Sequence, residues 1–141
     1  LINHFIINQN WFIVDLPGYG YASTSKSKRK EFQNMTEQYL KNRSSLICLF
    51  VLIDIKIPPQ ETDRKFMKYL GKNKIPFVIV FTKSDRISKI QIKKNVKEYK
   101  STMLQDWEEI PEIFISSVKN NRGATEILSF IEKYNQIFYS T

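Results

Sequence analysis

Residues 75–85 read IPFVIVFTKSD, an apolar run that ends abruptly in four polar residues. The run Ile75–Phe81 has no alternation of polar and apolar residues, which predicts a strand buried on both faces. A second run of this kind, Leu46–Ile53, ends at Asp54 and receives the same interpretation. Strands buried on both faces are typical of parallel sheets that helices cover on both sides. These two runs therefore predict an α/β fold.

The rest of the chain alternates strand and helix patterns. Phe5–Ile7 and Trp11–Val14 flank a short polar turn and predict a β-hairpin, and Ile113–Ile115 predicts another short strand. Apolar residues at helical spacing predict helices from Ser27, from about Phe66 to a stop at Gly71, from a capping box at Ser88, and after Gly123. We expect residues 1–141 to form one mostly parallel, doubly wound sheet with an antiparallel hairpin at its edge.

The composition of the chain limits the partners and the cellular compartment that we expect. The 141 residues carry 22 Lys and Arg against 14 Asp and Glu, a net charge of +8 that favours a polyanionic partner. The single cysteine, Cys48, allows no disulfide within the chain, which favours a reducing, cytoplasmic setting. The longest apolar run is too short to span a bilayer. A nicotinamide- or flavin-binding domain is poorly supported, because no GxGxxG motif opens a helix.

Short polar clusters follow three of the expected strands. These are Asp15–Gly18, Thr82–Asp85 and Ser116–Lys119. Each alone is equally well read as a tight turn, a helix cap or a solvated loop. Ligands of doubly wound sheets bind beyond the carboxyl ends of the strands, so the shared position of all three clusters indicates a ligand site.

The three clusters resemble the DxxG, [NT]KxD and SxxK motifs of Ras-like P-loop GTPases. The block VDLPGYGYA (14–22), together with Leu52–Asp54 and Thr82–Asp85, resembles more narrowly the EngB-type (YihA/YsxC) GTPases, over nearly the whole chain. The resemblance implies a Ras-like P-loop GTPase fold that binds GTP or GDP with Mg²⁺. It implies nucleotide contacts by Asp15, Leu16, Pro17, Gly18, Thr82, Lys83, Ser84, Asp85, Ile115, Ser116 and Ser117.

Each role that the resemblance implies has a chemical reason. Asp15 would hold a water on Mg²⁺, and Gly18 would donate its backbone N–H to the γ-phosphate. Asp85 would accept hydrogen bonds from guanine N1 and the exocyclic amine, which adenine cannot supply in that pattern. The stem of Lys83 would lie along the base. Thr82 would tie the loop to its neighbours, and the backbone N–H groups of residues 115–117 would approach guanine O6.

Two expected parts of such a site do not occur in the sequence. No GxxxxGK[ST] loop is found, and the switch Thr that completes the Mg²⁺ shell is absent. The resemblance places both upstream of Leu1, so we expect the printed sequence to begin partway through a longer chain, without its central first strand and its direct Mg²⁺ ligands. On that view the printed segment alone would fold poorly and bind GTP weakly. We identify no catalytic residue and no direct metal ligand within it.

Tyr19 stands where Ras-like enzymes place the Gln that orients water, which predicts slow intrinsic hydrolysis. The resemblance implies a nucleotide switch in assembly of the large ribosomal subunit, a monomer linked to the cell cycle and septation. Contact with rRNA is expected through Lys26, Lys28, Arg29 and Lys30, whereas Lys93 and Lys94 are interpreted as an ordinary solvated helix face. The alternative is a basic RNA-binding module with a degenerate nucleotide site.

Overall fold

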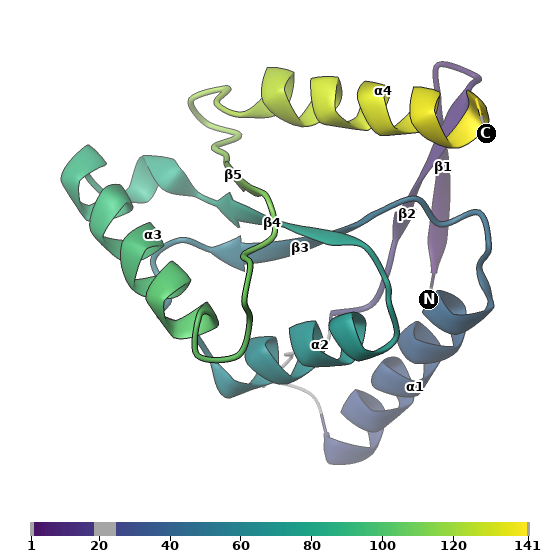
Figure 1. Cartoon of the computed structure of the whole chain (residues 1–141), viewed down its shortest axis with the longest axis horizontal. Coiled ribbons are helices and arrows are strands. Elements are labelled where there is room, and N and C mark those ends of the chain that lie inside the picture. The colour runs from purple at the N-terminus through teal and green to yellow at the C-terminus, as the bar shows by residue number, and fades with distance from the viewer. Residues whose placement is uncertain (1, 19–24, 141) are drawn as a thin grey trace. The chain divides into compact units, whose positions relative to one another are not determined.

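The computed structural model describes residues 2–18 and 25–140, and the chain divides into two compact units, Leu1–Ser44 and Ser45–Thr141. We describe each unit by itself (Figure 1). Among the described residues no helix is long and apolar enough to cross a membrane.

The first unit contains the expected hairpin. Strand β1 (Asn3–Ile7) pairs antiparallel with β2 (Trp11–Asp15), and Asn3 lies opposite Asp15. Asn8 and Gln9 turn the chain with φ angles of 50° and 55°, in the left-handed region that tight hairpin turns require. This hairpin forms a two-stranded sheet of its own among the described strands.

Helix α1 (Lys26–Asn42) follows in the same unit and confirms the helix expected from Ser27. Ser25 caps it by accepting a hydrogen bond from the Lys28 backbone N–H at 3.4 Å. The far end is linked to β1, because Arg43 donates a hydrogen bond to Nε2 of His4 at 2.9 Å. His4 is thus engaged by a guanidinium, and the described residues contain no cluster of three metal-ligating side chains.

The second unit is a three-stranded parallel sheet in the order β3 (Leu49–Asp54), β4 (Phe77–Thr82), β5 (Ile113–Ile115). The strands are connected by α2 (Glu61–Lys72) and by a short 3₁₀ turn (Ser84–Arg86) with α3 (Lys89–Met103), and α4 (Ala124–Ser140) follows the last strand. Asp54 pairs with Thr82, and Phe81 with Ile115, so the three carboxyl ends lie level.

Helices cover both faces of this sheet, with α4 on one side and α2 and α3 on the other (Figure 1). On the α4 side, Val78, Val80 and Phe114 pack against Ile127 and Phe130. On the opposite side the rings of Phe81 and Tyr99 meet edge to face with centroids 5.1 Å apart. The doubly wound α/β architecture is thereby confirmed, since alternate residues of β4 face the two helical layers.

Two details differ from the sequence expectation. Strand β3 begins at Leu49, and it is not buried on both faces, because Leu52 is 64% exposed. The strand lies at the edge of its sheet and pairs with β4 alone among the described strands. Gly71 lies inside α2 rather than ending it; a Cβ there would overlap the indole ring of Trp107, so close packing and not helix termination requires this glycine.

Candidate functional site

Two loops meet at the carboxyl edge of the parallel sheet. The first, Thr82–Asp85, begins at the last residue of β4, and the second, Ser116–Gly123, follows β5. The Ser84 N–H donates to the Ser116 carbonyl at 3.1 Å, and the Ser116 N–H donates to the Phe81 carbonyl at 2.8 Å. The structure therefore brings together two of the three polar clusters that the sequence singled out.

Asp85 is fixed by a side chain from the neighbouring loop. The Ser117 hydroxyl donates to Oδ1 of Asp85 at 2.7 Å. This hydrogen bond is the largest influence on the carboxyl group and lowers the pKa of Asp85, and the charges of Lys119 and Arg86 act in the same direction. Asp85 is therefore ionised at neutral pH and offers only acceptors.

The loop that carries Ser117 is closed by its own hydrogen bonds. Ser117 and Arg122 exchange backbone hydrogen bonds of 3.1 and 2.9 Å, and the Asn120 N–H donates to the Ser117 hydroxyl oxygen at 3.1 Å. The chain then passes through Gly123 at φ 89°, where a Cβ would meet the Ile115 carbonyl. The hydroxyl of Ser117 thus joins the folded loop to Asp85.

Lys83 adopts a left-handed conformation, with φ 60° and ψ 35°, which is uncommon for a residue other than glycine, asparagine or aspartate. Its Nζ lies 3.6 Å from Oδ2 of Asp54, while Oδ1 of Asp54 accepts from the Lys56 N–H at 2.9 Å. Local strain of this kind is typical of functional loops. The sequence analysis did not predict Asp54 as a site residue, although its position at the end of an apolar run was a usable signal.

Thr82 ties its loop to the neighbouring strand as expected, because its hydroxyl donates to the Ile53 carbonyl at 3.4 Å. The expected approach of the backbone N–H groups of residues 115–117 to guanine O6 stays a prediction. The N–H groups of Ser116 and Ser117 donate to the carbonyls of Phe81 and Arg122, so neither is directed to a ligand in this conformation. Both donors are already engaged, one in the strand pairing and one in the closed loop. The next residue in the chain is Val118, whose side chain is 100% exposed.

The remaining candidates lie in the first unit. Asp15 ends β2 with an exposed side chain, Leu16 and Pro17 are half-buried, and Gly18 is exposed. Tyr19, the basis for expecting slow hydrolysis, lies outside the described residues. The nucleotide roles of residues 15–18 therefore stay predictions that rest on the resemblance.

Replacing Ser117 by Ala should weaken GTP binding by about threefold to tenfold in the full-length protein, because Asp85 loses its orienting donor. As the pH is lowered, the variant should also lose its affinity for GTP at a higher pH than the parent protein does. In the parent protein the Ser117 hydrogen bond lowers the pKa of Asp85 and keeps it charged as the pH falls, whereas in Ser117→Ala the pKa returns toward its ordinary value. Titrations with GTP from about pH 4 to pH 7 check this, with the exposed Ser129→Ala as control. Superimposable pH profiles would contradict it.

Replacing Asp54 by Asn should speed GDP release by about twofold to fivefold, since Lys83 loses an ionic partner while the acceptor for Lys56 is kept. The expected effect is modest because the Lys83 side chain is half exposed. Stopped-flow release from Asp54→Asn, Lys83→Ala and the double variant measures the coupling, with the exposed Glu132→Gln as control. Strictly additive effects would show that Asp54 does not act through Lys83.

Comparison with known proteins identifies the family to which this chain is similar. A family model described as "50S ribosome-binding GTPase" matches residues 1–83, more than half of the chain. The "Probable GTP-binding protein EngB" of Christiangramia forsetii is 50% identical over 135 residues, which cover 96% of this chain and 68% of the relative. That of Bacteroides thetaiotaomicron is 45% identical, over 99% of this chain and 69% of the relative.

A solved structure shares the fold. The apo form of translation elongation factor SelB from Methanococcus maripaludis superposes with a TM-score of 0.68 at 22% identity, over 92% of this chain and 26% of that chain. At this identity the likeness concerns the fold alone. Taken with the relatives above, these findings show that the chain belongs to the EngB family of GTP-binding proteins.

Proposed function

We propose that this protein is a guanine-nucleotide switch that acts in assembly of the large ribosomal subunit and hydrolyses GTP slowly on its own. The observation that carries the nucleotide part is the Ser117–Asp85 hydrogen bond of 2.7 Å, which holds an ionised carboxylate at the junction of two loops. A carboxylate fixed in this way can accept from guanine N1–H and from the exocyclic amine together. Adenine has neither donor at those positions, so the same group selects the base.

The surrounding residues fit a guanine nucleotide. The stem of Lys83, held toward Asp54, would lie along the base, and Lys119 and Arg86 add positive charge near Asp85. We assign the contact with guanine O6 to the backbone N–H of Val118, in place of the donors of Ser116 and Ser117. Ile115 and Ser84 contribute by shaping the two loops.

On the strength of the resemblance, we assign the contacts with the phosphates and with the water on Mg²⁺ to residues 15–18. Asp15 has an exposed carboxylate, a hard oxygen ligand suited to a water on Mg²⁺, and Gly18 offers a backbone N–H without a side chain. Bound Mg²⁺ would neutralise charge on the β- and γ-phosphates. The resemblance aligns Tyr19 with the Gln that orients water in Ras-like enzymes, and a tyrosine cannot replace that amide, which supports slow hydrolysis.

The ribosomal part rests on the family and on charge. The matching family model is described as ribosome-binding, and the chain carries a net charge of +8, which suits a partner rich in phosphate. The cationic start of α1, Lys26 to Lys30, is one proposed contact with rRNA. A cytoplasmic location and a link to the cell cycle and septation complete the proposal.

The test has two arms in the full-length protein. Calorimetry should give micromolar or tighter binding of GTP and GDP and none of ATP, and single-turnover hydrolysis should be slow alone and faster with large-subunit particles. Binding of the particles without any nucleotide binding would instead support the alternative, a basic RNA-binding module. Fast unstimulated turnover, or no association with the particles, would contradict the switch.

A further inference from the structure

Helix α3 carries more lysines than any other helix of the described residues. Five of its 15 residues are lysine, namely Lys89, Lys93, Lys94, Lys97 and Lys100, and Glu98 is its one acidic residue. All five lysines are exposed. None forms an ion pair with any residue within 2–18 or 25–140. The helix thus presents uncompensated positive charge.

The lysines share one side of the helix. At about 100° per residue they fall within an arc of roughly 140°, next to the side that buries Ile92, Tyr99 and Met103 against the sheet. Ile90, 82% exposed, lies within the same arc. From Lys89 to Lys100 the row extends about 16 Å along the helix axis, a length that spans several phosphates of one nucleic-acid strand. We call these five lysines with Ile90 the α3 row.

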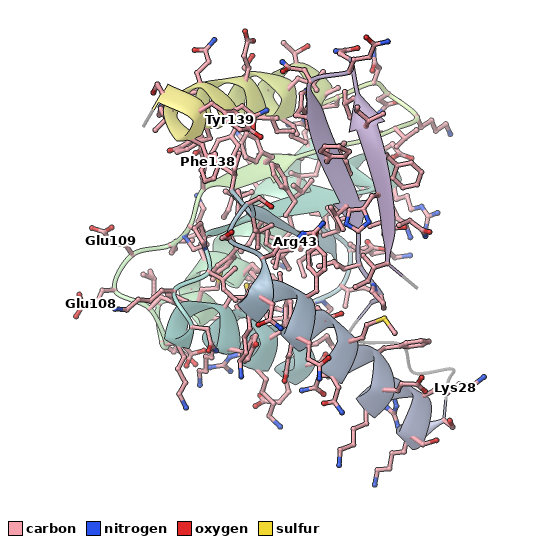
Figure 2. The ribbon with its side chains drawn as sticks, turned by 90° about the vertical axis from the view of Figure 1, so that its right-hand side faces the viewer. Lys28, Arg43, Glu108, Glu109, Phe138 and Tyr139 are labelled. Carbon is pink, nitrogen blue, oxygen red and sulfur yellow. The ribbon has the colours of Figure 1, made fainter. Side chains whose placement is uncertain are left out.

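The cations at the start of α1 are arranged differently. Lys28 lies roughly 160° around the helix from Lys26, and Arg29 and Lys30 fall on further directions. Figure 2 shows Lys28 pointing away from the first turns of α1. A single strand of phosphates therefore cannot meet all four at once from one side of that helix, whereas it can meet the whole α3 row.

We infer that the α3 row is the principal surface through which this protein binds the phosphate backbone of RNA. The inference rests on the proposed ribosomal function and names the face of the molecule that serves it. Charge complementarity selects the partner, since uncompensated lysines in a row suit a regular line of phosphates, and Ile90 adds an apolar contact for a sugar or a base edge. The sequence alone indicated that Lys93 and Lys94 form an ordinary solvated helix face. Together with the other members of the α3 row, we assign them to a binding surface.

The experiment uses the full-length protein and deproteinised large-subunit rRNA as the probe. Three variants each remove four positive charges: the α3 variant changes Lys89, Lys93, Lys97 and Lys100 to Gln; the α1 variant changes Lys26, Lys28, Arg29 and Lys30 to Gln; and a scattered control changes Lys41, Lys65, Lys72 and Lys133 to Gln. Glutamine is an uncharged residue with a helix propensity close to that of lysine. Thermal melts and GTP affinity establish that each variant is folded.

We expect the α3 variant to bind rRNA at least tenfold more weakly at low salt. Its slope of log affinity against log salt should be shallower by about 3, as the loss of four phosphate contacts requires. The scattered control should change the slope by less than about 1. Equal losses in all three variants, or a larger loss in the α1 variant, would overturn the inference.

Intact large-subunit particles separate this inference from the proposed function. If the parent protein binds neither particles nor rRNA, the proposed function fails. If the parent protein binds rRNA and the α3 variant binds it equally well, only the surface is wrongly assigned. If the α3 variant loses affinity for particles but keeps it for naked rRNA, the row meets an acidic protein, and the assignment to RNA is overturned.

Discussion

Replacing Asp85 by Asn should lower GTP affinity by at least about 100-fold and create affinity for xanthosine triphosphate. The carboxylate accepts two hydrogen bonds in the proposed site, and hydrogen bonds to charged groups are the strong ones. An Asn side chain directs one donor at the guanine amine and loses the charge. Xanthine carries a carbonyl at that ring position, which can accept from the Asn amide.

The gain of xanthine binding distinguishes a specificity change from a folding defect. Competition titrations with GTP, XTP and ATP on Asp85→Asn and the parent protein measure it directly. Glu109→Gln is the matched control, because this carboxylate is exposed and points outward from the loop between α3 and β5 (Figure 2). A variant that still prefers GTP over XTP would contradict the role given to Asp85.

Replacing Gly123 by Ala should lower the free energy of unfolding by about 3 kcal/mol. The backbone has φ 89° at this position, in a region costly for any residue with a Cβ, and the new Cβ would overlap the Ile115 carbonyl oxygen. The Ser116 Cα is also within 3.2 Å of that Cβ. Relief requires backbone movement at the end of β5, where Ser117 is held.

Thermal unfolding checks this result, with an expected fall in Tm of roughly 6–12 °C. Thr125→Ala is the control, an exposed change two residues further along that leaves the backbone path intact. GTP affinity of Gly123→Ala should fall together with stability, because the same loop positions Asp85. A Tm within about 1 °C of the parent protein would show that the loop accommodates the methyl group.

Much of the fold could be predicted from periodicity. The hairpin, the strand before Thr82 and the helix from Ser88 lie where the patterns put them, because burial on defined faces controls those residues. The strand over Leu49–Asp54 was predicted, but the exposure of Leu52 on it and the position of Gly71 inside α2 were not. Both depend on residues distant in sequence: β3 lies at the edge of its sheet, and the indole of Trp107 packs against Gly71.

The candidate site divides in the same way. The sequence by itself determined the α/β class, because long apolar runs predict buried parallel strands, and the polar clusters at the strand ends carried the resemblance that identified the family. The role of Asp85 in selecting the base stays a prediction of that resemblance. Only the tertiary structure decided how that carboxylate is held: by Ser117, 32 residues away, while the N–H groups of Ser116 and Ser117 are taken by Phe81 and Arg122. A hydrogen bond between distant residues depends on strand register and loop closure, which no local pattern encodes.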